Sequence, residues 1–253
     1  FVVRTYDFAE ADRVIVLLTR THGLVRAVAK GVRKSKSRFG SRLQPFVDVD
    51  VQVYPSRTSG LATITAADTV AYYGRLLIDD FDRYTTACAI METAEKLAFD
   101  DADPALFDLV ADALANVQTS AQPTLVLDAF MLQATQHAGW GLALFNCAQC
   151  EAPGPHTAFN AAAGGAVCTR CRPPGSADVH TEVLHAMWLL QHGHQLADQL
   201  ADQLAEQPAD RPANQPAQLQ PGALAEQIHR LTTAHLQFNL EAGLKTLRIM
   251  EQA

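Results

Sequence analysis

The stretch Val47-Asp-Val-Asp-Val-Gln-Val53 alternates apolar and polar residues without a break. Side chains of a β-strand point to opposite faces in turn, so this pattern predicts a strand whose four valines face a core. Shorter apolar runs at 14–18 and 24–28 flank a turn-like Thr21-His-Gly23 and predict a hairpin, and a further strand is expected over 61–70. Four or five short strands in so short a stretch favour a small closed barrel of the OB type.

From about Leu76 onward, apolar residues recur at helical spacing. Asp103-Pro104 is typical of a helix N-cap followed by proline at the first helical position, and Gly139 is expected to end a helix. The stripes that predict helices include Tyr84, Cys88 and Met91; Leu106, Val110 and Leu114; Leu127, Phe130 and Met131; Val183, Met187 and Leu190; and Leu224, Ile228 and Leu231. The expected fold class is therefore α+β, an N-terminal OB-fold β-barrel followed by an α-helical domain.

A run with a four-residue period, from Gln195 to Pro221, interrupts the helical part. Its first half is compatible with an extension of the preceding helix. Its second half contains prolines that remove backbone donors, so we expect that half to be extended and disordered, within a linker at 195–221 that is rich in Gln, Ala and Pro.

The sharpest motif is a pair of Cys-x-x-Cys turns, Cys147-Ala-Gln-Cys150 and Cys168-Thr-Arg-Cys171. Such turns, separated by about 15 to 20 residues, converge into a tetrahedral site for Zn²⁺. We expect one structural zinc ion, because four thiolates leave no open position for a catalytic water. Disulfides and redox chemistry are the alternatives, and both are disfavoured.

The charge is divided unevenly along the chain. The net charge is −7, yet residues 1–57 hold 11 Lys and Arg against 5 Asp and Glu. Within this part, 26–42 contains no acidic residue, and its cations predict contacts with nucleic-acid phosphates. Those cations are Arg26, Lys30, Arg33, Lys34, Lys36, Arg38 and Arg42. Phe39 and Phe46 are interleaved with them and offer stacking surface for unpaired bases, although Phe46 also fits the core. The bland alternative is a solvated loop.

Several function classes find little support. No apolar run approaches the ~18 residues of a membrane-spanning helix, and no secretory leader precedes Phe1, so we expect a cytoplasmic protein. No phosphate-binding loop, metalloprotease motif or serine-hydrolase motif occurs, and we expect no enzyme.

Together these features resemble the RecO family of bacterial recombination mediators. The passages that carry the resemblance are Arg4-Thr-Tyr-Asp-Phe-Ala-Glu-Ala-Asp-Arg13, His22-Gly-Leu-Val-Arg-Ala-Val-Ala-Lys-Gly-Val32, Ser37-Arg-Phe-Gly40, the module from Cys147 to Cys171, and Leu244-Lys-Thr-Leu-Arg248. The insertion at 195–221 and the acidic Glu241-Ala-Gly243 depart from the family pattern.

The resemblance implies an OB fold at 1–75, helices at 76–145, a Cys₄ zinc module at 146–175 and C-terminal helices at 176–253. It also implies binding of single-stranded and double-stranded DNA, strand annealing, partnership with RecR, contact with the C-terminal tail of single-stranded DNA-binding protein, and RecA loading. The expected location is the cytoplasm, in association with the nucleoid.

Two other hypotheses stay open beside this one. The first is a zinc-ribbon module that binds nucleic acid or adapts proteins without annealing activity. The second is a metal-dependent nuclease, which would need a carboxylate cluster. The candidate residues look like solvated helix ends instead: Asp79, Asp80, Asp82, Asp100 and Asp101.

Overall fold

The computed structural model describes residues 1–55, 61–193, 219–240 and 243–250, and forms two units, residues 1–119 and 120–253. Most of the predicted linker, residues 195–218, lies outside the described residues, and so does the possible extension of the preceding helix. Within the described ranges, the helices are too short or too polar to cross a bilayer.

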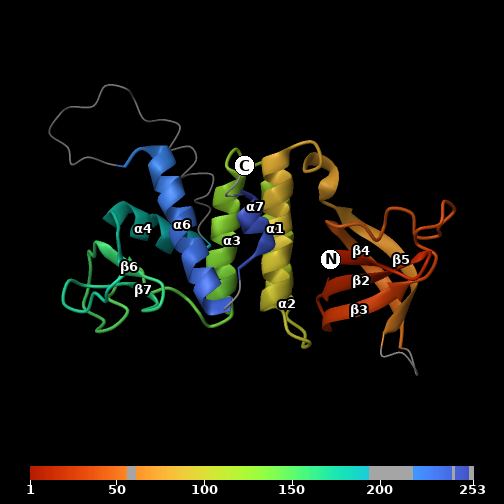
Figure 1. Ribbon diagram of the computed structural model, residues 1–253, viewed down its shortest axis with the longest axis horizontal. Helices are drawn as coiled ribbons and strands as arrows, with labels where there is room; N and C mark the ends of the chain where they lie inside the picture. Colours follow the sequence, from red (N-terminus) through yellow and green to blue (C-terminus); the bar gives the residue numbers. More distant parts are fainter. Residues whose placement is uncertain (56–60, 194–218, 241–242, 251–253) are drawn as a thin grey trace. The chain divides into compact units, whose positions relative to one another are not determined.

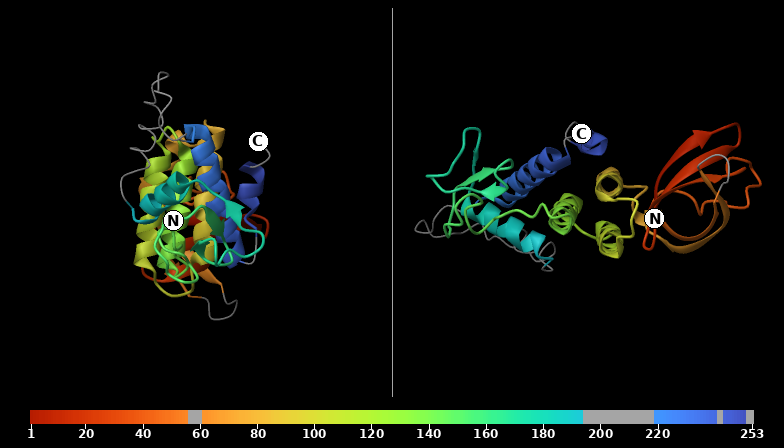
Figure 2. Two further views of the ribbon diagram at one scale, coloured as in Figure 1. Left: turned by 90° about the vertical axis from the view of Figure 1, so that its left-hand side faces the viewer. Right: turned by 90° about the horizontal axis from the view of Figure 1, so that it is seen from below.

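The first unit begins with a five-stranded sheet (Figure 1). Its strands are β1 (Val2–Phe8), β2 (Asp12–Thr19), β3 (Gly23–Ala29), β4 (Val47–Tyr54) and β5 (Ala62–Tyr72). The order is β1-β2-β3-β5-β4, and β3 pairs with β5 in parallel while the other pairs are antiparallel. The sheet curls until β1 and β4 approach each other, which is visible in the view from below in Figure 2. This arrangement is consistent with the predicted OB fold.

The barrel core follows the alternation read from β4. Val47 and Val49 are buried, and Val51 and Val53 pack against the same cluster from partly buried positions. Asp50 on the same strand is exposed. The prediction for this strand is therefore confirmed.

Two helices complete the first unit, α1 (Phe81–Leu97) and α2 (Pro104–Val117), after a short 3₁₀ turn η1 (Gly74–Leu76). The segment between them lies against the β2–β3 hairpin, where the Leu24 N–H donates to the Phe99 carbonyl over 3.1 Å. At Gly23, φ is +59°, and a Cβ there would collide with the backbone of Phe99 and Asp101. Only glycine fits this position, because it tolerates both the backbone conformation and the close approach.

The caps of these helices follow the sequence signals. Asp80 accepts a hydrogen bond from the Arg83 N–H at the start of α1, and Asp103 accepts one from the Leu106 N–H at the start of α2. Each side chain satisfies one of the backbone donors that a helix start leaves without an intrahelical partner.

The second unit contains α3 (Pro123–His137), α4 (Thr181–Gln191), α6 (Pro221–Leu240) and the short α7 (Lys245–Met250). A three-stranded sheet of order β7-β6-β8 separates α3 from α4, with β6 at Ala158–Asn160, β7 at Gly165–Ala166 and β8 at Ala177–Asp178. Phe159 of β6, Leu132 of α3, Met187 of α4 and Ile228 of α6 belong to one buried cluster. The small sheet therefore packs against the helices and shares their core.

Candidate nucleic-acid surface and metal centre

The β3–β4 loop, residues 30–46, carries most of the predicted cations and is anchored by apolar residues. Phe39 and Leu43 are 1% and 2% exposed and belong to the core cluster of the barrel. With these side chains inside, the polar residues between them must face solvent. All seven predicted cations are exposed: Arg26, Lys30, Arg33, Lys34, Lys36, Arg38 and Arg42.

Tight turns hold the first half of the loop. The Lys34 N–H donates to the Gly31 carbonyl over 3.1 Å, and the Ser37 N–H donates to the Lys34 carbonyl over 2.9 Å. No carboxylate among the described residues pairs with Lys34 or Lys36. Compact turns therefore present these two ammonium groups to solvent from a supported backbone.

The second half of the loop uses its arginines partly for its own structure. The Arg38 guanidinium lies 4.8 Å from the centre of the Phe39 ring and donates to the Ile64 carbonyl over 3.4 Å. Arg42 donates to the Arg38 carbonyl over 2.9 Å. Both side chains stay exposed, so each retains donors that a phosphate can accept.

An acidic residue on β1 forms ion pairs with two arginines. The Asp7 carboxylate lies 3.0 Å from Arg13 Nε and 3.2 Å from an Arg33 terminal nitrogen. The β1–β2 register places Asp7 opposite Arg13. The positive surface thus includes Arg13, which lies outside the predicted stretch 26–42. Its sequence signal is weak, because Arg13 has acidic neighbours in the chain.

The prediction that Phe39 offers a stacking surface is wrong. Phe39 is 1% exposed and Phe46 is 4% exposed, with the Phe46 ring packed edge-on against Tyr84 at 5.6 Å. Phe46 is in the core, as its alternative reading allowed. The two rings anchor the loop, and neither can stack on a base without leaving the core.

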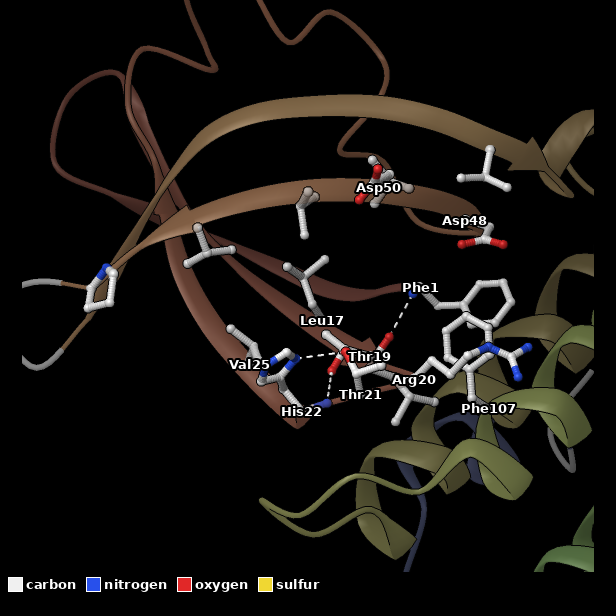
Figure 3. Close-up of a pocket in the computed structure, with 16 residues that line it drawn as sticks. Phe1, Leu17, Thr19, Arg20, Thr21, His22, Val25, Asp48, Asp50 and Phe107 are labelled. Carbon is white, nitrogen blue, oxygen red and sulfur yellow. Dashed lines mark hydrogen bonds between the residues drawn. The ribbon is translucent and has the colours of Figure 1, made fainter.

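A groove of about 630 Å³ lies at the other end of β2 and β3, beside the hairpin turn (Figure 3). Arg20 lines it, but its guanidinium lies 4.8 Å from the Phe107 ring centre and pairs with Asp108. Asp48 and Asp50 of the facing strand β4 also line this groove. None of the seven predicted cations lines this groove, and its two carboxylates disfavour a polyanion.

The four predicted zinc ligands come together in the second unit. Their Sγ atoms all lie within 4.8 Å of one another, and those of Cys150 and Cys168 are 3.8 Å apart. Zn–S bonds of about 2.3 Å in a tetrahedron place two sulfurs about 3.8 Å apart. The donor set thus fits a tetrahedral metal ion of this size.

Backbone contacts position these sulfurs. The first Cys-x-x-Cys turn closes where the Glu151 N–H donates to the Cys147 carbonyl over 2.9 Å, and the second where the Cys171 N–H donates to the Cys168 carbonyl over 3.1 Å. The Ala148 N–H donates to the Ala166 carbonyl over 2.8 Å and joins the first turn to β7. The first turn is therefore held by the small sheet as well as by any metal.

The sulfurs affect one another electrostatically. The Cys168 N–H donates to the Cys147 sulfur over 3.4 Å and is the main cause that lowers the pKa of Cys147 to about 6. Hydrogen bonding to the sulfurs of Cys150 and Cys168 favours the thiol form of Cys171 and raises its pKa to about 12. Four thiolates at this spacing repel one another, and a divalent cation offsets that repulsion.

Two protein-family models match the chain. The model described as "Recombination protein O N terminal" matches residues 1–73, and the model described as "Recombination protein O C terminal" matches residues 78–248. The chain belongs to the RecO family. RecO proteins are recombination mediators that act in DNA repair and bind DNA. The N-terminal RecO match ends one residue after β5, so it covers the barrel and its basic loop.

Proposed function

We propose that this RecO protein is a mediator that binds single-stranded and double-stranded DNA through its β3–β4 loop and anneals complementary strands. The observation that carries the proposal is the placement of the loop. Its cations project from a backbone fixed by the buried Phe39 and Leu43, and residues 26–42 contain no acidic residue. Lysine and arginine side chains that neutralise phosphates supply the sequence-independent part of DNA affinity.

Annealing follows from the same charges without catalytic turnover. Two strands repel through their phosphates, and a surface that neutralises both lets them approach until base pairs form. The sequence contains no phosphate-binding loop for a nucleotide, so base pairing and binding supply the free energy. Residues beyond 57 carry 22 Asp and Glu against 9 Lys and Arg, which keeps DNA away from them and leaves them for proteins.

Family membership supports the partners of this proposal. They are RecR, the C-terminal tail of single-stranded DNA-binding protein and, indirectly, RecA, which is loaded on the coated strand. The metal of the Cys₄ module is proposed to be one Zn²⁺ held by Cys147, Cys150, Cys168 and Cys171. With four sulfur ligands it stabilises the fold and leaves no position for a reacting water.

A salt titration of binding tests the proposal. If five phosphates are neutralised, log K for a single strand falls with log salt at a slope of about −3.5. The double variant Lys34→Glu/Lys36→Glu should flatten this slope by about 1.4 and weaken binding to all sequences alike. The matched control, Arg75→Glu/Lys96→Glu, makes the same charge change at exposed positions outside the loop. Equal effects of the two double variants would place the DNA site elsewhere.

The runner-up function is a zinc-ribbon adaptor whose basic loop meets acidic proteins. The same titration separates it from the mediator. An adaptor would bind DNA weakly at physiological salt and would not anneal strands.

A further inference from the structure

Two aromatic side chains of β1 face solvent beside the basic loop. Tyr6 is 43% exposed and Phe8 is 45% exposed. They are two residues apart on a strand, so both lie on one face, about 6.8 Å from each other along the strand. Arg4 precedes them on this face, and its guanidinium lies 5.9 Å from the centre of the Tyr6 ring. The face therefore presents a cation and two rings in a row.

The strand register brings this row to the start of the basic loop. Phe8 lies opposite Asp12 of β2, and the Asp12 carboxylate accepts a 2.7 Å hydrogen bond from the Gly31 N–H. The Arg33 N–H donates to the Ala11 carbonyl over 3.0 Å, so the start of the loop lies beside the β1–β2 turn that follows Phe8. Asp7, which pairs with the Arg33 side chain, points to the opposite face of the strand from the rings. The rings thus have Arg4 at one end and the start of the loop at the other.

The acidic groups near the rings are largely occupied. Asp7 pairs with two arginines, Asp12 holds the loop backbone, and Glu95 of α1 pairs with Arg4 over 2.7 Å. Glu10, in the β1–β2 turn, is exposed. Two of these four carboxylates, Asp7 and Glu95, are therefore offset by arginines.

Single exposed aromatic residues are ordinary on protein surfaces. Tyr54 of β4 is 64% exposed, but its strand carries Asp50, which lies directly opposite Asp68 of β5. A phosphate would be repelled there. The row on β1 differs because its two rings lie in line with Arg4 and next to the start of the basic loop, and rings combined with cations bind single strands by base stacking.

We propose that Tyr6 and Phe8 stack on unpaired bases and make the basic surface prefer single-stranded DNA to duplex. The bases of a duplex are stacked on one another, so their faces are closed to protein rings, whereas an unpaired strand offers a ring face at each base. Cations of the loop bind both forms, and the rings add affinity for one form only. This inference rests on the proposed function, because it assumes that DNA lies on the loop.

The test uses the full-length protein and two probes of equal length, an oligo(dT) strand and a duplex. Phe8→Leu and Tyr6→Leu remove the ring and keep an apolar side chain. Each should weaken binding to the single strand by about 5- to 150-fold, which corresponds to the ~1–3 kcal/mol that stacking is worth per base. Duplex affinity and the salt slope on both probes should stay unchanged, and the control Tyr54→Leu should change neither affinity.

A second variant reports stacking directly and does not depend on loss of a side chain. The chain has two tryptophans, Trp140 and Trp188, both outside the first unit. Phe8→Trp adds a tryptophan to the row on β1. Its fluorescence should be quenched by oligo(dT) more strongly than the fluorescence of the wild type, and the duplex should cause no such added quenching.

Equal losses on both probes, or full single-strand affinity in Phe8→Leu together with no added quenching in Phe8→Trp, would overturn the stacking role. These outcomes are distinct from failure of the proposed function. If the proposed function is wrong, Lys34→Glu/Lys36→Glu would leave the affinity for both probes at the wild-type value.

Discussion

The Asp7 carboxylate of β1 lies 3.2 Å from the Arg33 guanidinium of the β3–β4 loop. The contact joins residues 26 positions apart and ties the loop to the first strand. It also reduces the positive charge available to a DNA phosphate, because the same carboxylate pairs with Arg13 over 3.0 Å.

Replacing Asp7 by Asn should therefore strengthen DNA binding. The variant removes one negative charge and releases Arg13 and Arg33 for phosphates. We expect roughly fivefold tighter binding at low salt, the equivalent of about 1 kcal/mol for an exposed ion pair, and a salt slope on single strands steeper by about 0.7 for each added contact. Fluorescence anisotropy against salt measures both. Asp178→Asn, which breaks the exposed pair with Arg172, is the control for net charge. Weaker binding in Asp7→Asn would mean that the tie between loop and strand matters more than the released charge.

The Cys₄ module should depend on its metal. Cys168→Ala should lose the bound ion and unfold residues 146–175, because metal binding is part of the folding free energy of such modules. Metal content per chain, together with limited proteolysis, measures the effect. Cys88→Ala is the control, because Cys88 lies on α1 and outside the group of four sulfurs. A metal-free wild type that resists proteolysis as well as the loaded protein would rule out a structural ion.

Asp103 should stabilise α2 through its cap. Asp103→Ala removes the acceptor of the Leu106 N–H, 2.9 Å away, and should lower the free energy of unfolding by about 1 kcal/mol. Urea unfolding measures this loss. The control is Gln122→Ala at the N-cap of α3, where the side chain makes no capping hydrogen bond and little change is expected. Equal losses in the two variants would show that the cap bond of Asp103 is not the cause.

The cap of α1 should make stability depend on pH. The hydrogen bond from the Arg83 N–H lowers the pKa of Asp80, and the Arg83 charge acts in the same direction. The folded pKa therefore lies below the unfolded value of about 3.9, so the stabilisation is present above about pH 4 and is lost as the pH falls through the folded pKa. Asp80→Asn keeps an oxygen acceptor but does not titrate. Its deficit in unfolding free energy should be largest near neutral pH and shrink in acid, and a deficit that stays constant with pH would contradict this origin.

The parts predicted from sequence are those in which local chemistry sets the structure. The alternation of Val47 to Val53 fixes a strand and its buried face, and paired Cys-x-x-Cys turns place sulfurs where a metal can hold them. Asp103-Pro104 predicts a helix start because both residues act on the first turn itself.

The failures concern residues whose role depends on distant parts of the chain. Phe39 sits in a loop without periodicity, so its sequence neighbours do not show that it fills the barrel. Likewise, the cluster of Asp7, Arg13 and Arg33 depends on the β1–β2 register and on the path of the β3–β4 loop. Local sequence patterns do not specify either of them.

The most direct test of the central claim is strand annealing by the full-length protein. Fluorescently labelled complementary oligonucleotides, with and without single-stranded DNA-binding protein, are followed in the absence of ATP. We predict that the wild type accelerates annealing over buffer, that the rate falls as salt rises, and that Lys34→Glu/Lys36→Glu loses the acceleration while Arg75→Glu/Lys96→Glu keeps it. A requirement for ATP, or equal rates with the wild type and with buffer, would contradict the account.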